Sequence, residues 1–311
     1  MGRVRAITAI TVVAALCVIG GPGRVFMADD SPQVQTLLVS IKKLTPIHKK
    51  LGPPGPNDWL AQHPEPGQDF PQYVQSDPVT ARGRRNTIYV QPIGDFTPTQ
   101  RKIVGLTADF LGRYFALKVR TKDGLPLSLI PAEARRRHPS WGMDQVLSTY
   151  VLDQLLTPRL PEDACAFIAL TPVDLWPGPG WNFVFGQASS RDRVGVWSFY
   201  RNGDPDQGED AFRLCLLRTL KTATHETCHM FSMPHCIQYE CCLCGSNHRE
   251  ESDRRPLELC PVCLAKLCYA TGADPARRFK RLAEFCREQG LVKEADFYEL
   301  SLRTLSAPSP R

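Results

Sequence analysis

One short motif constrains this chain more than any other feature. Residues 225–229 read H-E-T-C-H, an H-E-x-x-H pattern, within a segment from 209 to about 231 that has no proline or glycine and predicts one long helix. Residues four apart in a helix differ in direction by about 40°, so His225 and His229 project from one face. Two imidazoles on one face can share a zinc ion. Glu226, beside the first, can take a proton from a zinc-activated water.

A third histidine follows at the spacing needed to complete a metal site. His235 stands six residues after His229, and Pro234 stops the helix before it. Ser232 lies in the expected turn, where a left-handed backbone would cost a serine about 1 kcal/mol or more. We therefore predict that His225, His229 and His235 bind a catalytic Zn²⁺ and that Glu226 is the general base.

Cysteines form a second cluster directly after these histidines. Seven of the 12 cysteines fall between residues 228 and 263. Four thiolates can close a tetrahedral structural zinc site with no open position for water. Two sets have plausible spacing, and they share Cys241, Cys260 and Cys263 but differ in using Cys236 or Cys244 as the fourth ligand. A third possibility is that some of them pair as disulfides, if the chain is exported.

The combined pattern resembles the archaemetzincin family. The order H-E-x-x-H-x5-H-C-x4-C from residue 225, followed by C-x-x-C at 260–263, is similar to that family's signature. Further likenesses, which together extend over about residues 86–270, lie in the segments 88–94, 163–165, 181–189, 194–196 and 245–248.

This resemblance implies a fold, an activity and a ligand set. The fold would be an α+β, metzincin-type zincin fold with a mixed twisted sheet, a long active-site helix and a Cys-rich second zinc site. The activity would be that of a zinc metallopeptidase acting on a peptide or protein. The resemblance assigns the second of two Zn²⁺ ions per chain to four cysteines in preference to the alternative set, namely Cys236, Cys241, Cys260 and Cys263.

Two positions depart from the family pattern. Ser232 replaces a glycine, and Leu243 replaces a methionine that would pack in a turn beneath the catalytic metal. Leucine keeps most of the volume of methionine, so we expect a small cost in stability.

The N-terminus predicts export. Residues 1–28 begin with Arg3 and Arg5, continue with an apolar stretch over 6–21 and end in small and polar residues, which is the layout of a secretory signal peptide. We expect a secreted or periplasmic protein. The alternative is a protein anchored in the membrane by an uncleaved N-terminal segment.

Proline and glycine divide the remainder of the chain into three parts. Residues 29–85 are rich in proline and predict an extended arm, residues 86–270 the catalytic domain, and residues 271–311 a C-terminal helical hairpin and tail broken at Gly290. The net charge of the chain is only +6, from 38 basic and 32 acidic residues, and so modest a charge does not suggest a nucleic-acid partner.

No apolar run after the first thirty residues is long enough to cross a bilayer.

Hydrophobic periodicity predicts the individual elements. The expected strands are 87–91, 115–120, 164–170, 183–187 and 194–200, and the expected helices are 97–114, 143–156, 209–231, 274–289 and 291–305. The segment 182–188 is a candidate sheet edge along which an extended peptide could pair.

Three hypotheses follow from these patterns. The leading one is a zinc metallopeptidase. The second is a catalytically silent, zinc-stabilised interaction protein, in which Ser232 and Leu243 mark a relaxed site. The third is an exported, disulfide-rich binding domain without zinc.

Overall fold

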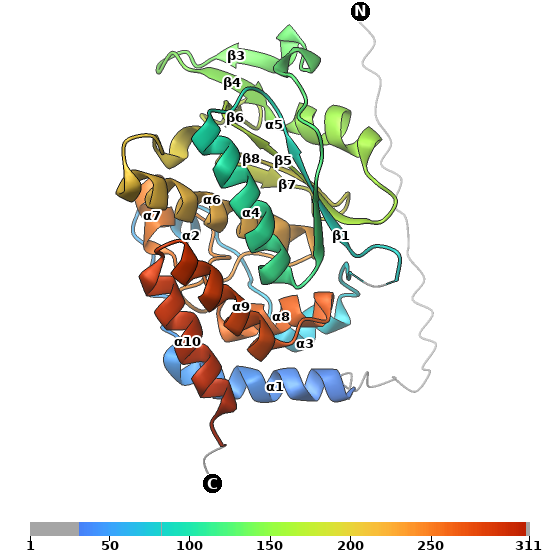
Figure 1. The fold of residues 1–311 in the computed structure, drawn as a ribbon, viewed down its shortest axis with the longest axis vertical. Helices are drawn as coiled ribbons and strands as arrows, with labels where there is room; N and C mark the ends of the chain where they lie inside the picture. The colour runs from blue at the N-terminus through green and yellow to red at the C-terminus, as the bar shows by residue number, and fades with distance from the viewer. Residues whose placement is uncertain (1–30, 82, 309–311) are drawn as a thin grey trace, which may run out of the picture.

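A five-stranded mixed sheet forms the centre of the molecule (Figure 1). The computed structural model describes residues 31–81 and 83–308, so the export signal expected at 1–28 lies outside the described residues. The strand order is β2-β1-β5-β8-β7, in which β7 alone is antiparallel to its neighbour. These strands are β1 (Thr87–Pro92), β2 (Lys118–Thr121), β5 (Ala164–Thr171), β7 (Gly186–Ala188) and β8 (Val194–Ser198). The expected mixed α+β architecture is confirmed.

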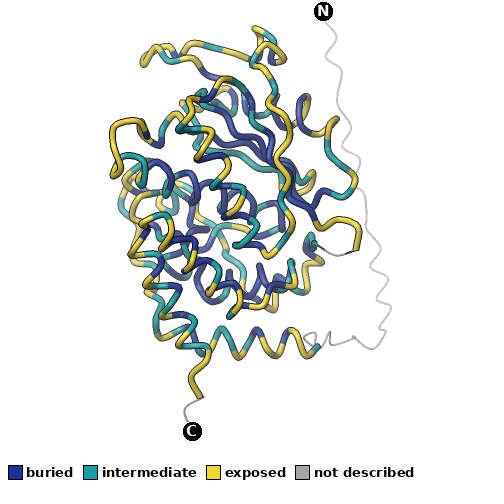
Figure 2. Tube along the Cα trace, in the orientation of Figure 1, coloured by how far each residue is buried: buried dark blue, intermediate teal, exposed yellow. Residues whose placement is uncertain are grey.

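Helical segments cover both faces of this sheet. Helices α4 (Pro98–Phe115) and α6 (Glu209–Met230) pack on one face. On the other face lie α5 (Ser148–Tyr150) and the π-helical turn Val151–Leu156. Every residue of β5 is buried, as expected for a strand covered on both faces, and Figure 2 shows the buried centre of the sheet.

The expectation of an extended arm at 29–85 is wrong for its first part. Residues 32–44 form helix α1 (Pro32–Leu44), capped by Ser31, and two shorter helices follow, α2 (Trp59–Gln62) and α3 (Phe70–Gln75). Pro32 stands at helix position N1, where proline is tolerated, and the next proline of this region is Pro46. Buried Leu37 and Leu44 then give α1 an apolar face that packs on helix α8 (Pro261–Thr271).

Two further expectations are corrected, one in the second, smaller sheet and one in the central sheet. The segment 143–156 begins as strand β4 (Asp144–Leu147), not as a helix, because it pairs with β3 (Arg135–Arg137) and β6 (Asp174–Trp176). The strand expected at 115–120 begins only at Lys118, because α4 continues to Phe115 and ends at a left-handed Ala116.

The C-terminal part is helical. Helices α7 (Arg249–Arg254) and α8 (Pro261–Thr271) were not predicted, whereas α9 (Pro275–Glu288) and α10 (Val292–Ser306) form the expected hairpin. Figure 1 shows α10 beside α1, with α8, α9 and α3 between these helices and the rest of the molecule. In the part of the chain that the structure describes, no helix is both long and apolar enough to span a membrane.

The packing of α1 predicts a measurable contribution to stability. Replacement of Leu37 by alanine should lower the free energy of unfolding by about 2–5 kcal/mol, because its side chain is buried against the core. Val39→Ala, on the exposed face of the same helix, should change it by less than about 0.5 kcal/mol. Chemical denaturation of both variants checks this. Equal, small effects would mean that α1 does not belong to the cooperative core.

Candidate active site

The structure brings the three predicted histidines together at the end of α6. His225 and His229 lie on one face of the helix, with ring centroids 4.6 Å apart. The ring of His235 returns to within 5.2 Å of His225 and 4.9 Å of His229, measured between centroids. One nitrogen of each ring lies within 4.8 Å of the others.

A tight turn after α6 returns the third histidine. The amide of Met233 donates to Cys228 O at 3.3 Å, and that of Ser232 donates to His229 O at 2.9 Å, which is the Schellman pattern of helix termination. Ser232 takes the left-handed position, with φ of +60°, so it adopts the strained conformation that its place in the sequence suggested. Its hydroxyl accepts a hydrogen bond from Val79 N at 3.2 Å, which offsets part of the cost.

Each imidazole is oriented by an oxygen on its outer nitrogen. His225 Nδ1 lies 3.0 Å from Cys242 O, and His229 Nδ1 lies 2.7 Å from Met233 O. His235 Nδ1 lies 2.7 Å from Glu65 Oε1. Because all three partners accept hydrogen bonds, each Nδ1 carries the proton and each Nε2 keeps a free lone pair.

The inner nitrogens fit a shared cation. Nε2 of His225 and Nε2 of His229 are only 3.0 Å apart, and two lone pairs at that distance repel unless a positive charge lies between them. Burial lowers the pKa of His229 to about 4 and that of His225 well below its ordinary value, so both rings are neutral at pH 7. Neutral imidazoles with preset tautomers are suitable ligands for zinc.

Glu226 lies at the boundary between α6 and the sheet edge. A methyl group added at Gly186 in β7 would lie 2.8 Å from Glu226 Oε1, so the carboxylate lies directly against the strand backbone. Both residues line a cleft of about 1110 Å³ that also exposes the three histidines. Burial raises the pKa of Glu226 to about 8. A nearby cation would act in the opposite direction and favour the carboxylate.

Four cysteines form a second group of donors. Their sulfur atoms lie within 4.8 Å of one another and are buried, and the four residues are Cys236, Cys241, Cys260 and Cys263. Backbone amides support the sulfurs: Cys260 N donates to Cys241 Sγ at 3.2 Å, and Cys263 N donates to Cys260 Sγ at 3.5 Å. This is the set implied by the family resemblance.

The alternative set is not brought together in the same way. Cys244 Sγ lies 3.2 Å from Tyr239 O, to which it donates. Hydrogen bonds from neighbouring thiols, Cys241 first, hold the pKa of Cys236 far below its usual range, whereas burial raises that of Cys241.

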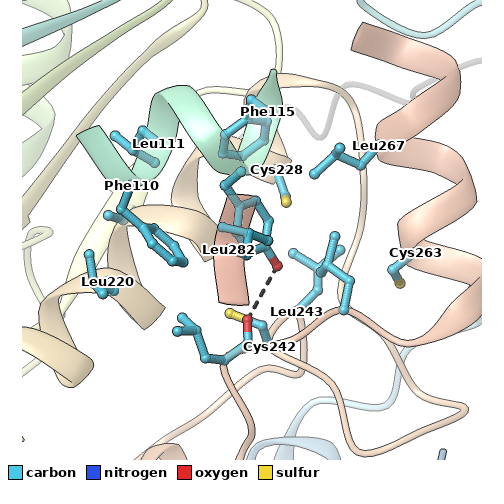
Figure 3. Close-up of a cluster of buried hydrophobic side chains, with 14 of the residues drawn as sticks. Phe110, Leu111, Phe115, Leu220, Cys228, Cys242, Leu243, Cys263, Leu267 and Leu282 are labelled. Carbon is cyan, nitrogen blue, oxygen red and sulfur yellow. Dashed lines mark hydrogen bonds between the residues drawn. The ribbon is translucent and has the colours of Figure 1, made fainter. Parts of the chain in front are cut away.

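Leu243 occupies a packed position in the hydrophobic core. It is fully buried, and Figure 3 shows it with Cys242 and Cys263 among the side chains of the core. Its carbonyl accepts a hydrogen bond from Cys236 N at 2.8 Å. Leu243 is therefore a packing residue of the core.

A third group of donor atoms is occupied by protein partners. Asp58, His248 and Glu251 also have donor atoms within 4.8 Å of one another. However, Arg254 donates to both carboxylate oxygens of Asp58, and Arg255 donates to Glu251. These carboxylates are paired with guanidinium groups and serve as a structural link.

Comparison with known proteins agrees with the geometry. Residues 115–268 match the model of peptidase family M54. Human archaemetzincin-2 is 35% identical over 266 residues, which cover 75% of this chain and 73% of that protein. Human archaemetzincin-1 is 29% identical, over 72% of this chain and 51% of that protein. A solved archaemetzincin from Methanopyrus kandleri aligns with a TM-score of 0.49 at 28% identity, over 62% of this chain and 98% of that one.

The family-model match and the archaemetzincin relatives define a zinc-dependent metallopeptidase. More specifically, the chain belongs to the archaemetzincin family, peptidase family M54.

Sequence reasoning did not identify the groups that support the predicted ligands. Glu65 comes from the proline-rich segment, and nothing in its local pattern indicates a role. The other two partners are the backbone carbonyls of Met233 and Cys242, which no pattern of side chains in the sequence indicates. Gly186 fell within the predicted sheet edge, but its approach to Glu226 depends on tertiary packing.

The contact at Gly186 predicts a sensitive position. Gly186→Ala should displace the Glu226 carboxylate while leaving the histidines in place, so hydrolysis of a fluorogenic peptide library should fall by about 100-fold with zinc content unchanged. Gly105→Ala, on the exposed face of α4 with open space around it, is the matched control and should keep full activity. Full activity in Gly186→Ala would show that the position of Glu226 against β7 is unimportant.

Proposed function

We propose that His225, His229 and His235 hold the catalytic zinc and that Glu226 is the general base in peptide-bond hydrolysis. The observation that carries this proposal is the convergence of three Nε2 atoms whose rings are each fixed by an oxygen at Nδ1. That arrangement leaves three Nε2 lone pairs free in rings whose ligand atoms lie within 4.8 Å of one another, beside a carboxylate that lines the same cleft.

The chain's own residues supply proton transfer. When bound, zinc provides Lewis-acid chemistry: it makes a water molecule more acidic and polarises the carbonyl of the peptide bond. Glu226 accepts the proton of the attacking water and then donates it to the leaving amine nitrogen. Its buried position against β7 keeps the carboxylate beside the cleft and limits its motion.

The substrate is a peptide or protein segment in extended form. β7 is the last strand of its sheet, so one of its edges is not paired with any other described strand. A peptide added at this edge would form main-chain hydrogen bonds and pass close to Glu226 at Gly186. The neighbouring residues Trp181, Phe183 and Phe185 line the cleft and offer apolar contacts for substrate side chains.

The second zinc is structural in this proposal. Cys236, Cys241, Cys260 and Cys263 would bind it with no position left for water or substrate. Their burial and the backbone amides that donate to Cys241 and Cys260 support this role. The chain would then carry two zinc ions with different functions.

The catalytically silent alternative is less well supported. It requires that Ser232 and Leu243 disturb the geometry of the histidine site. The left-handed backbone at Ser232 nevertheless returns His235 to the other two histidines, and Leu243 is packed in the core.

Replacement of the proposed base separates binding from catalysis. Glu226→Gln keeps the shape of the side chain but removes its ability to accept a proton at neutral pH. The rate of peptide hydrolysis should fall by at least about 10²–10⁴-fold, with zinc per chain unchanged by elemental analysis. Equal activity in the mutant would remove Glu226 from the mechanism, and loss of zinc would mean that it has a different role.

The two cysteine sets make opposite predictions. Cys241→Ser would not discriminate between them because both sets contain it, so the informative pair is Cys236→Ser and Cys244→Ser. Zinc content should fall by about one ion per chain in the first variant and stay unchanged in the second, because the sulfur of Cys236 lies within 4.8 Å of the other three sulfurs, whereas Cys244 is not part of that group. The reverse result would assign the fourth ligand to Cys244.

A further inference from the structure

His235 differs from the other two histidines in its support. His225 and His229 are held by a helix and by neutral carbonyls, whereas His235 lies on the loop after Pro234 and its Nδ1 contacts the carboxylate of Glu65 at 2.7 Å. A hydrogen bond to a carboxylate is stronger than one to a carbonyl, and it raises the basicity of the opposite ring nitrogen. The ring of His235, which no helix holds in place, therefore has the strongest hydrogen-bond acceptor of the three.

The carboxylate of Glu65 accepts a second hydrogen bond on the same oxygen. Trp59 Nε1 donates to Oε1 at 2.6 Å, and the indole ring of Trp59 meets the ring of His235 edge-on, with centroids 5.2 Å apart. The two donors fix the direction of the carboxylate. Its side chain is 21% exposed and that of His235 is 18% exposed, so water has limited access to the pair.

The segment that carries Glu65 is fastened to the body of the protein. We call residues 57–65 the strap. Asp58 accepts two hydrogen bonds from Arg254 Nη2, at 2.8 and 2.9 Å, and Trp59 N donates to Glu251 at 3.0 Å. A methyl group added at Gly245 would lie 2.3 Å from the Trp59 ring, so the indole rests directly on the backbone there.

We propose that Glu65 is a positioning residue for the third histidine: it holds His235 with Nδ1 protonated and Nε2 directed at the other two imidazoles. This inference rests on the proposed function only in taking the histidine site to be the zinc site. Glu65 lies outside residues 115–268, which match the family model, so the strap supplies an outer part of the metal centre from a region beyond that match.

Zinc affinity tests this role independently of turnover. The probe is Zn²⁺ itself, in competition with a chelator, and the histidine-site ion is defined as the one that His235→Ala lacks. Glu65→Ala should weaken binding of that ion by about 10–100-fold, whereas Glu65→Gln, which keeps an acceptor oxygen, should lose less. Circular dichroism establishes that the variants are folded.

Two controls separate positioning from general effects. Trp59→Phe removes the other donor to Glu65 but leaves the contact between Glu65 and His235, so zinc affinity should fall by less than in Glu65→Ala. Glu284→Gln removes an exposed carboxylate on α9 and should have no effect. If zinc affinity falls equally in Trp59→Phe and Glu65→Ala, Glu65 only holds the strap in place and does not position His235, and the proposal is overturned.

The remaining outcomes are also decisive. If Glu65→Ala is folded and binds the histidine-site zinc as tightly as the wild type, the inference about Glu65 fails and the proposed peptidase site stands. If wild type and His235→Ala contain the same amount of zinc, the histidines do not hold the metal, and the inference and the proposed site fail together.

Discussion

A single loop, residues 235–243, connects the two groups of metal-binding side chains. His235 and Cys236 are neighbours in the chain, yet one belongs to the histidine group and the other to the cysteine group. At the far end of the loop, the Cys241 sulfur joins the cysteine group, while the next carbonyl, that of Cys242, orients His225. The hydrogen bond from Cys236 N to Leu243 O closes the loop. The geometry of the histidine site therefore depends on the cysteine cluster.

The rest of the fold supplies the other constraints on that site. Helix α6 packs on the sheet and fixes His225, His229 and Glu226 relative to the edge strand β7. The N-terminal region closes the opposite side: Tyr73 donates to Phe231 O at 2.6 Å at the end of α6, and the strap reaches His235 through Glu65. Elements far apart in sequence thus meet at one turn, where a strained Ser232 persists because packing on several sides determines its conformation.

The sequence predicted those parts of the site that depend on local spacing. The histidines follow helical periodicity and a turn, and the four cysteines followed from the family resemblance. Glu65 could not be found, because its contact with His235 spans 170 residues and its proline-rich surroundings suggested only a loop. Helix α1 could not be predicted from the proline content of 29–85, because its buried residues Val34, Leu37 and Leu44 lie in a stretch that has no proline after position N1. The apolar residues of strand β4 fit the period of a helix as well as that of a strand, and only the pairing of β4 with β3 and β6 decides between them.

The zinc sites can be tested most directly by a crystal structure with anomalous diffraction measured on both sides of the zinc absorption edge. We expect two zinc peaks, one bound by Nε2 of His225, His229 and His235, and one among the sulfurs of Cys236, Cys241, Cys260 and Cys263. We also expect Glu65 to contact Nδ1 of His235, as it does here. A peak only at the cysteines, with His235 turned away from the other two histidines, would contradict the central claim that this loop builds a catalytic zinc site.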